Sequence, residues 1–74
     1  METKLIVKLV GADGKEFNIG TQALMDLMHL ETRYWVAAQQ LANIDFEYYK
    51  AQIYEMLETG AKYYGCELKG VKVV

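Results

Sequence analysis

A short segment in the second half of the chain, LANIDFEYY, runs from Leu41 to Tyr49 and interrupts an otherwise helical pattern. Asn43 suits the left-handed residue that ends a helix, and Asp45 is a good N-cap for the helix that follows. Ile44 and Tyr49 occupy the two positions of a hydrophobic staple. The segment therefore predicts the end of one helix and the start of another, with a connection so short that the two are antiparallel.

Apolar residues recur at helical spacing on both sides of this break. Before it, residues 22–42 predict a helix with a wide apolar face, wider than one neighbouring helix can cover. After it, residues 46–64 predict a helix with a narrower apolar stripe, ended by Gly65. Gly60 lies on this stripe, and a glycine inside a helix is unfavourable unless another element approaches closely there.

Runs of β-branched and apolar residues at the two ends of the chain predict three β-strands. The first two, residues 4–10 and 16–19, are joined by an Asp-Gly turn that suits a hairpin. The third covers residues 66–74 and contains Gly70, which predicts a β-bulge. The expected fold is one α+β domain spanning residues 1–74, in the order ββααβ, with a three-stranded sheet packed against two antiparallel helices.

Alternation along each strand assigns its side chains to the two faces of the sheet. In the first two strands, the residues expected to face the core are Leu5, Val7, Leu9, Phe17 and Ile19. In the third strand, Val71 and Val73 are expected on one face, with Cys66 and Leu68 on the other.

The chain has 74 residues, of which 53% are hydrophobic, so a single copy has more apolar surface than it can easily bury. Small domains compensate for a marginal core with disulfides, a metal or self-association. Cys66 is the only cysteine, which excludes an internal disulfide, and with His29 it falls short of the four ligands that structural zinc takes. Good helix packing or self-association remains, and of these we expect self-association as a symmetric homodimer.

Aromatic residues are the best candidates for a binding surface. The six tyrosines are many for this length, and exposed Tyr and Trp are preferred anchors of protein interfaces. The residues predicted to bind a partner are Tyr34, Trp35, Tyr48, Tyr54 and Glu31. Glu31 falls within the apolar face of the first helix. Either the helix bends or breaks near residues 29–32, or Glu31 reaches water at the rim, or it pairs with Arg33 or Lys50 of a second copy. The alternative for the tyrosines is that they cap the edge of the core with their hydroxyls in water.

A second hypothesis is nucleic-acid binding by the lysines of the sheet, Lys4, Lys8 and Lys72. The net charge of −2 argues neither for nor against it. Sheet-based modules stack bases on aromatic side chains, whereas Ile6 and Val10 occupy the matching positions here. Lysines on strands also protect a sheet from edge-to-edge aggregation, and we favour that explanation.

The residue types present predict no enzyme and no cofactor or metal. His29 lacks a neighbouring nucleophile, and Cys66 follows a helix C-terminus, where the dipole disfavours a reactive thiolate. Charges interrupt the first apolar run, so we expect no signal peptide, no membrane span and a cytoplasmic location. The sequence thus predicts a small protein-interaction module, with a role as regulator or inhibitor of a larger partner protein.

Overall fold

The computed structural model describes residues 4–20 and 33–74. Within these ranges the chain forms strand β1 (Leu5–Val10), strand β2 (Glu16–Gly20), helix α2 (Arg33–Tyr63) and strand β3 (Glu67–Val73). The α+β class and the three strands are confirmed. The prediction of two separate helices is wrong, because one long helical element takes their place and the order is ββαβ. The predicted helical residues 22–32, with Glu31 and His29, lie outside the described residues.

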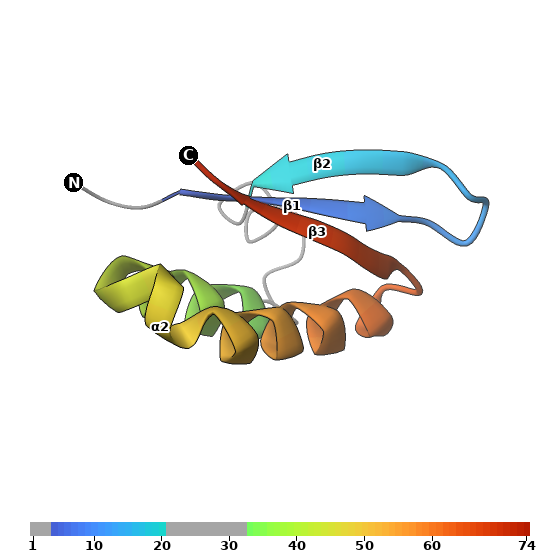
Figure 1. Cartoon of the computed structure of the whole chain (residues 1–74). Coiled ribbons are helices and arrows are strands. Elements are labelled where there is room, and N and C mark those ends of the chain that lie inside the picture. The colour runs from blue at the N-terminus through green and yellow to red at the C-terminus, as the bar shows by residue number, and fades with distance from the viewer. Residues whose placement is uncertain (1–3, 21–32) are drawn as a thin grey trace.

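The three strands form an antiparallel sheet in the order β2-β1-β3, so that β1 is central and β3 lies at an edge. The turn between β1 and β2 is the predicted Asp-Gly turn, in which the Asp13 carboxylate accepts a hydrogen bond from the backbone N–H of Lys15 at 3.0 Å. Figure 1 shows α2 covering one face of this sheet, with no described helix on the other face.

The face of the sheet turned toward α2 carries the core. Leu5, Val7 and Leu9 are fully buried, as expected. The strand register pairs Val7 with Ile19 and Leu9 with Phe17, and directly paired side chains share a face. Ile19 packs against the core, whereas Phe17 lies on the correct face but remains 42% exposed.

Strand β3 contains the predicted bulge. Gly70 pairs with Lys8 and Leu68 pairs with Leu9, so Lys69 is the extra residue. A bulge residue shifts the alternation by one position, which brings side chains before and after it to the same face. The residues of this segment that pack against the core are Cys66, Leu68 and Val71. The prediction that the valines face away from Cys66 and Leu68 is wrong for this reason.

Helix α2 reverses its direction at Asp45. A straight helix of 31 residues would span about 46 Å. The rings of Tyr34 and Tyr63, near its two ends, nevertheless have centroids only 5.8 Å apart. Asp45 has non-helical dihedral angles, φ −165° and ψ 94°. Its carboxylate accepts a hydrogen bond from the backbone N–H of Tyr48 at 3.2 Å, which confirms the predicted N-cap.

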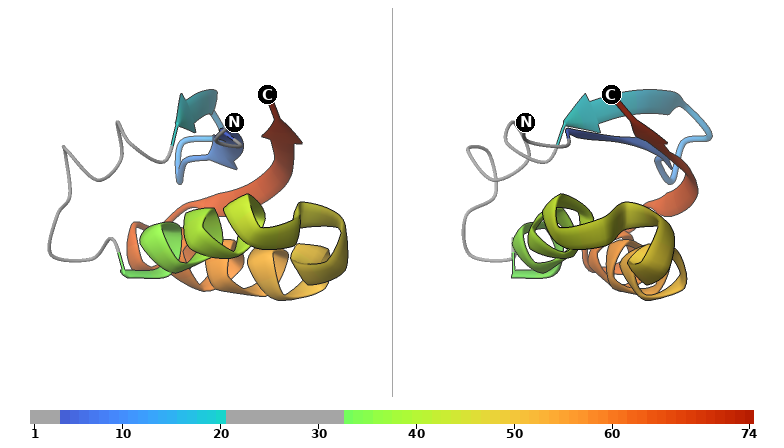
Figure 2. Two further views of the ribbon diagram at one scale, coloured as in Figure 1. Left: turned by 90° about the vertical axis from the view of Figure 1, so that its left-hand side faces the viewer. Right: turned by 60° about the vertical axis from the view of Figure 1, so that its left-hand side comes forward.

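We refer to residues 33–44 as the first arm of α2 and to residues 46–63 as its second arm; Figure 2 shows them side by side. Asn43 stays helical, and its side-chain oxygen accepts a hydrogen bond from Gln39 Nε2 at 3.1 Å, one turn earlier. No described non-glycine residue has a positive φ, so the predicted left-handed conformation of Asn43 is wrong. A single non-helical residue thus replaces the expected connection between two helices.

The two arms meet where Trp35 of the first packs against Gly60 of the second. A Cβ atom at position 60 would lie 3.0 to 3.2 Å from three indole atoms, Cε2, Cζ2 and Nε1. This contact confirms the close approach predicted at Gly60. Tyr64 stacks on the same indole, with ring centroids 6.5 Å apart. The second arm then ends as predicted at Gly65, whose φ is 68° and whose N–H donates to the carbonyl oxygen of Lys62 at 3.1 Å.

We expect Gly60→Ala to destabilise the fold, because the added methyl group meets a fully buried Trp35. Overpacking costs about 1–3 kcal/mol, which exceeds the gain of about 1 kcal/mol in helix propensity. Denaturant unfolding of Gly60→Ala, Trp35→Phe and the double variant measures the coupling between them. The smaller ring leaves room for the methyl group, so the double variant should lose less stability than the sum of the two single variants.

Gly70→Ala is the matched control, since a Cβ atom there meets nothing within 4 Å. Strictly additive losses in the double variant, or a stabilising Gly60→Ala, would contradict the close contact between the two arms.

Candidate functional site

The structure removes Trp35 from the predicted binding surface. Its side chain is fully buried in the core, because the reversal of α2 turns it toward Gly60. Within the described ranges its buried indole N–H has no hydrogen-bond acceptor. A buried unpaired donor costs about 1–3 kcal/mol, which the large apolar surface of the ring offsets. The role of Trp35 in this structure is therefore packing, and the prediction that it contacts a partner is corrected.

Tyr34, also predicted to bind a partner, lies with Arg33 and Tyr63 where the first and last turns of α2 meet, which we call the open end of α2. Nη2 of Arg33 donates hydrogen bonds to the hydroxyl oxygens of Tyr34 at 3.3 Å and Tyr63 at 3.2 Å. The guanidinium carbon lies 4.9 and 5.8 Å from the two ring centroids. We refer to these three side chains as the Arg33 clamp, because they join the first turn of α2 to its last.

These contacts shift the pKa values of the clamp. The hydrogen bond donated by Arg33 lowers the pKa of Tyr34 below the ordinary value of a tyrosine, and Tyr63 adds to the effect. The same hydrogen bond raises the pKa of Arg33. Tyr34 therefore ionises at a lower pH than an isolated tyrosine, beside a guanidinium that stays charged.

Tyr48 and Ile44 lie at the reversal of α2, which is its closed end, and are the most exposed large hydrophobic side chains there, at 77% and 70%. Tyr49 packs edge-on against Tyr48, with ring centroids 4.8 Å apart. Ile44, which we expected to pack against Tyr49 in a staple, is instead largely in water. The closed end of α2 thus presents two large side chains to solvent, and the exposure expected of Tyr48 is confirmed.

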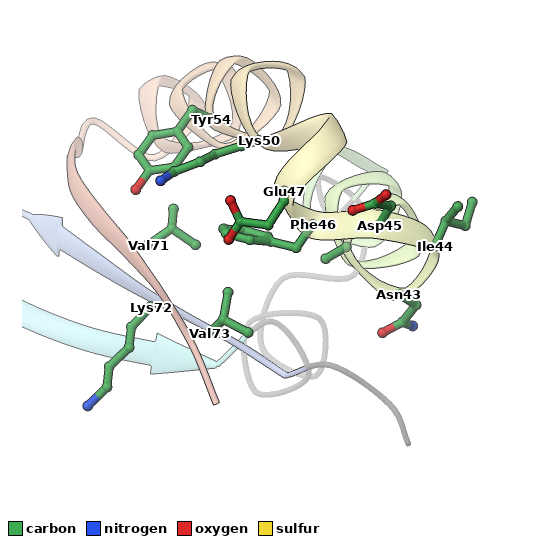
Figure 3. A pocket seen from close by; sticks show the side chains of 11 residues that line it. Asn43, Ile44, Asp45, Phe46, Glu47, Lys50, Tyr54, Val71, Lys72 and Val73 are labelled. Carbon is green, nitrogen blue, oxygen red and sulfur yellow. The ribbon is translucent and has the colours of Figure 1, made fainter.

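Tyr54 lines a groove between the second arm of α2 and strand β3, with a volume of about 560 Å³. The apolar or aromatic residues that line this β3 groove are Ala42, Ile44, Phe46, Tyr54, Val71 and Val73. Figure 3 shows Phe46 near its centre, with Val71 and Val73 directed toward it.

Charged side chains line the β3 groove together with the apolar ones. In Figure 3, Lys50 lies with Tyr54 at the Val71 end of the groove, the Glu47 carboxylate lies beside Phe46 near its centre, and Asp45 lies farther from the Val71 end. The side chain of Lys72, which belongs to the opposite face of β3, points away from the groove. The basic side chain is thus at the Val71 end, and the acidic side chains lie at the centre and beyond it.

The β3 groove follows the free edge of the sheet. Three successive residues of β3 line it, namely Val71, Lys72 and Val73. Because successive side chains of a strand point to opposite faces, the backbone at the strand edge is itself part of the groove lining. Lys4 and Val74 exchange backbone hydrogen bonds of 3.3 and 2.9 Å, which sets the phase of the antiparallel ladder. Because hydrogen-bonded and non-hydrogen-bonded pairs alternate, Val71 and Val73 direct their N–H and C=O groups away from β1. No described strand pairs with that edge of β3.

The lysines of the nucleic-acid hypothesis lie together on the outer face of the sheet. Lys72 pairs with Ile6, and Lys4 and Lys8 are on the same face of β1 as Ile6. Nζ of Lys8 lies 3.4 Å from a carboxylate oxygen of Glu16, which partly neutralises it. The hollow on this face is lined by no aromatic side chain within the described ranges. The structure therefore brings the three lysines together without a platform for base stacking.

The residues of the β3 groove that the sequence pattern did not identify as site residues include Phe46, Val71 and Val73. The pattern predicts Phe46 only as part of a helical apolar stripe and the two valines only as one face of a strand. The sequence held a partial signal for the valines, because Val71 and Val73 flank Lys72 and this alternation indicates a strand with one apolar face. The position of that strand at the sheet edge depends on strand order, and strand order is not visible in a local pattern.

In the described part of the chain, no helix is long and apolar enough to cross a membrane. No three His, Cys, Asp or Glu side chains of residues 4–20 and 33–74 lie close enough together to hold a metal ion. No protein-family model, curated protein or solved structure matches this chain.

The Arg33 clamp generates a test by titration. Arg33→Gln should raise the pKa of Tyr34 toward the ordinary tyrosine value, because the donated hydrogen bond and the positive charge are both lost. NMR titration of ring-labelled tyrosines measures the shift, with Tyr34→Phe identifying the signal. Lys62→Gln, which removes another positive charge from the last turn of α2, should leave Tyr34 unchanged. A Tyr34 pKa that does not respond to Arg33→Gln would show that the clamp is not formed.

Proposed function

We propose that this chain is a non-enzymatic protein-interaction module that associates with itself as a homodimer. The observation that carries the proposal is the β3 groove, in which Phe46 and two valines lie along a strand edge that no described strand pairs with. Such an edge offers backbone hydrogen bonds and the groove offers apolar area, and together these are what strand addition uses. The charged residues away from the centre of the groove resemble the polar rim of a protein interface.

The physical case rests on the size of the chain. A domain of 74 residues buries a smaller share of its apolar surface than a larger one. Each Å² of apolar surface removed from water contributes about 25 cal/mol. Covering Phe46, Tyr54 and the two valines in a dimer therefore adds stability that the monomer lacks.

The closed end of α2 is available for a further partner. Tyr48 is 77% exposed and does not line the β3 groove, so it stays exposed when the groove is filled. We propose that this end contacts a larger protein, which the chain regulates or inhibits. Exposed aromatic and aliphatic side chains in such a position are common interface anchors.

Tyr54→Glu should convert the dimer to a monomer, because it places a carboxylate in the apolar part of the interface. Light scattering coupled to size-exclusion chromatography measures the mass, which for the wild type should be twice 8.5 kDa. Tyr48→Glu is the matched control, since it adds the same charge to the same arm outside the groove. Its mass should equal that of the wild type. A monomeric wild type over all accessible concentrations would contradict the proposal.

A second candidate is nucleic-acid binding, and the observation that favours it is the grouping of Lys4, Lys8 and Lys72 on one face of the sheet. Contacts from these lysines would reach phosphates only, so the binding would be independent of sequence. Single-stranded nucleic acid suits a flat sheet face, and its affinity would fall with salt.

Fluorescence anisotropy of a labelled single-stranded oligonucleotide tests this candidate. If three lysines neutralise three phosphates, log Kobs should fall against log salt with a slope of about −2, from roughly 0.7 per phosphate. Replacing Lys4, Lys8 and Lys72 by alanine should abolish binding. Replacing Lys15, Lys50 and Lys62 should not. Absence of binding at low salt would eliminate the candidate.

A further inference from the structure

We infer that a second copy of this chain docks along the free edge of β3, so that the two β3 strands pair antiparallel and the two sheets become one. This inference rests on the proposed self-association and specifies the surface that mediates it. It leaves the two α2 helices on the same side of the joined sheet, where each covers its own half.

The backbone groups for this pairing are already in place. Val71 and Val73 point their N–H and C=O groups away from β1, toward the open edge. An incoming strand must offer groups with the same spacing of two residues. The Val71 and Val73 groups of a second copy do so.

The regular part of β3 selects one register. The bulge at Lys69 disturbs the strand before Gly70, so only the residues that follow can pair regularly. Within that part, Val71 lies opposite Val73 of the second copy, and Val73 lies opposite Val71 of the second copy. These are two hydrogen-bonded pairs related by a two-fold axis. The axis passes between Lys72 and Lys72 of the second copy, which face each other in a non-hydrogen-bonded pair on the outer, solvent-facing side.

The side chains on the helix face favour the same arrangement. Each Val71 packs against a Val73 of the second copy over the β3 groove, and the pair covers Phe46. The two-fold axis reverses the groove of the second copy. Lys50 at the Val71 end of one groove therefore comes toward Asp45 and Glu47 of the second copy. This charge complementarity is an argument for a second copy over an unrelated extended peptide.

The facing lysines are the one unfavourable contact of this register. Like charges directly opposite each other on a sheet repel, and water screens them on the outer face.

Disulfide trapping tests the register. In a Cys66→Ser background, Lys72→Cys places two thiols in a non-hydrogen-bonded pair with Cα atoms about 4.5 Å apart, within the range of about 4.4–6.8 Å that a disulfide spans. Lys8→Cys is the matched control on the same face, since β1 is separated from β1 of the second copy by three strand spacings, about 14 Å. We expect Lys72→Cys to form a covalent dimer in air at least tenfold faster than Lys8→Cys.

A second variant tests the backbone bonds. Val73→Pro removes the outward N–H but no hydrogen bond to β1, so the monomer should keep its fold by circular dichroism while its mass falls to that of one chain. If the wild type is a dimer but Lys72→Cys and Lys8→Cys cross-link at equal rates, the β3 edge is overturned as the interface and self-association is left intact. A wild type that is monomeric at every concentration would overturn both.

Discussion

The contact between Trp35 and Gly60 is the constraint on which the rest of this structure depends. A helical segment of this length can fold back on itself only if its two arms approach closely, and the missing Cβ of Gly60 lets the indole ring lie against the backbone of the second arm. The ring then fills the space between the arms and the buried side chains of β1. Asp45 makes the reversal possible by leaving the helical conformation and capping the second arm.

The direction of the second arm follows from this contact and determines the groove. Because the chain leaves the second arm at Gly65 and returns at once as β3, the two elements run antiparallel and Phe46 comes to lie near Val73. On its inner side β3 pairs with β1, and on its outer side no described strand pairs with it. Natural sheets usually protect such edges with charges or bulges. Here Lys72 and the bulge at Lys69 are present, yet two valines still face the groove, which is why we interpret the edge as a binding surface.

Much of the fold could be predicted from local patterns, because those patterns report directly on local geometry. Alternation identified the buried residues of β1, the glycine inside the helical stripe identified the close approach at Gly60, and the cap preference identified Asp45. Other predictions failed where the outcome depends on how deeply a side chain is buried or on how distant segments of the chain are arranged. The helical projection placed Trp35 on an apolar face but could not tell whether that face was covered, and it is covered completely. Asn43 stayed helical because one capping residue was enough to turn the chain.

The candidate site was less predictable than the fold for the same reason. Tyr54 and Tyr48 were both predicted to bind a partner, and they lie on different surfaces of the second arm, since Tyr54 lines the β3 groove and the exposed Tyr48 does not. The Arg33 clamp joins residues near opposite ends of α2, and the β3 groove depends on strand order, so neither has a signature in neighbouring positions. Glu31 remains a prediction, since it lies outside the described residues.

The central claim is that the outward backbone groups of β3 are paired in a dimer, and amide hydrogen exchange measures this most directly. Exchange rates of individual amides are followed by NMR at high protein concentration and after dilution below the dissociation constant. The account predicts that the N–H groups of Val71 and Val73 are protected at high concentration and lose protection on dilution, while that of Lys72, bonded to β1, stays protected throughout. Rapid exchange at Val71 and Val73 at every concentration would contradict it.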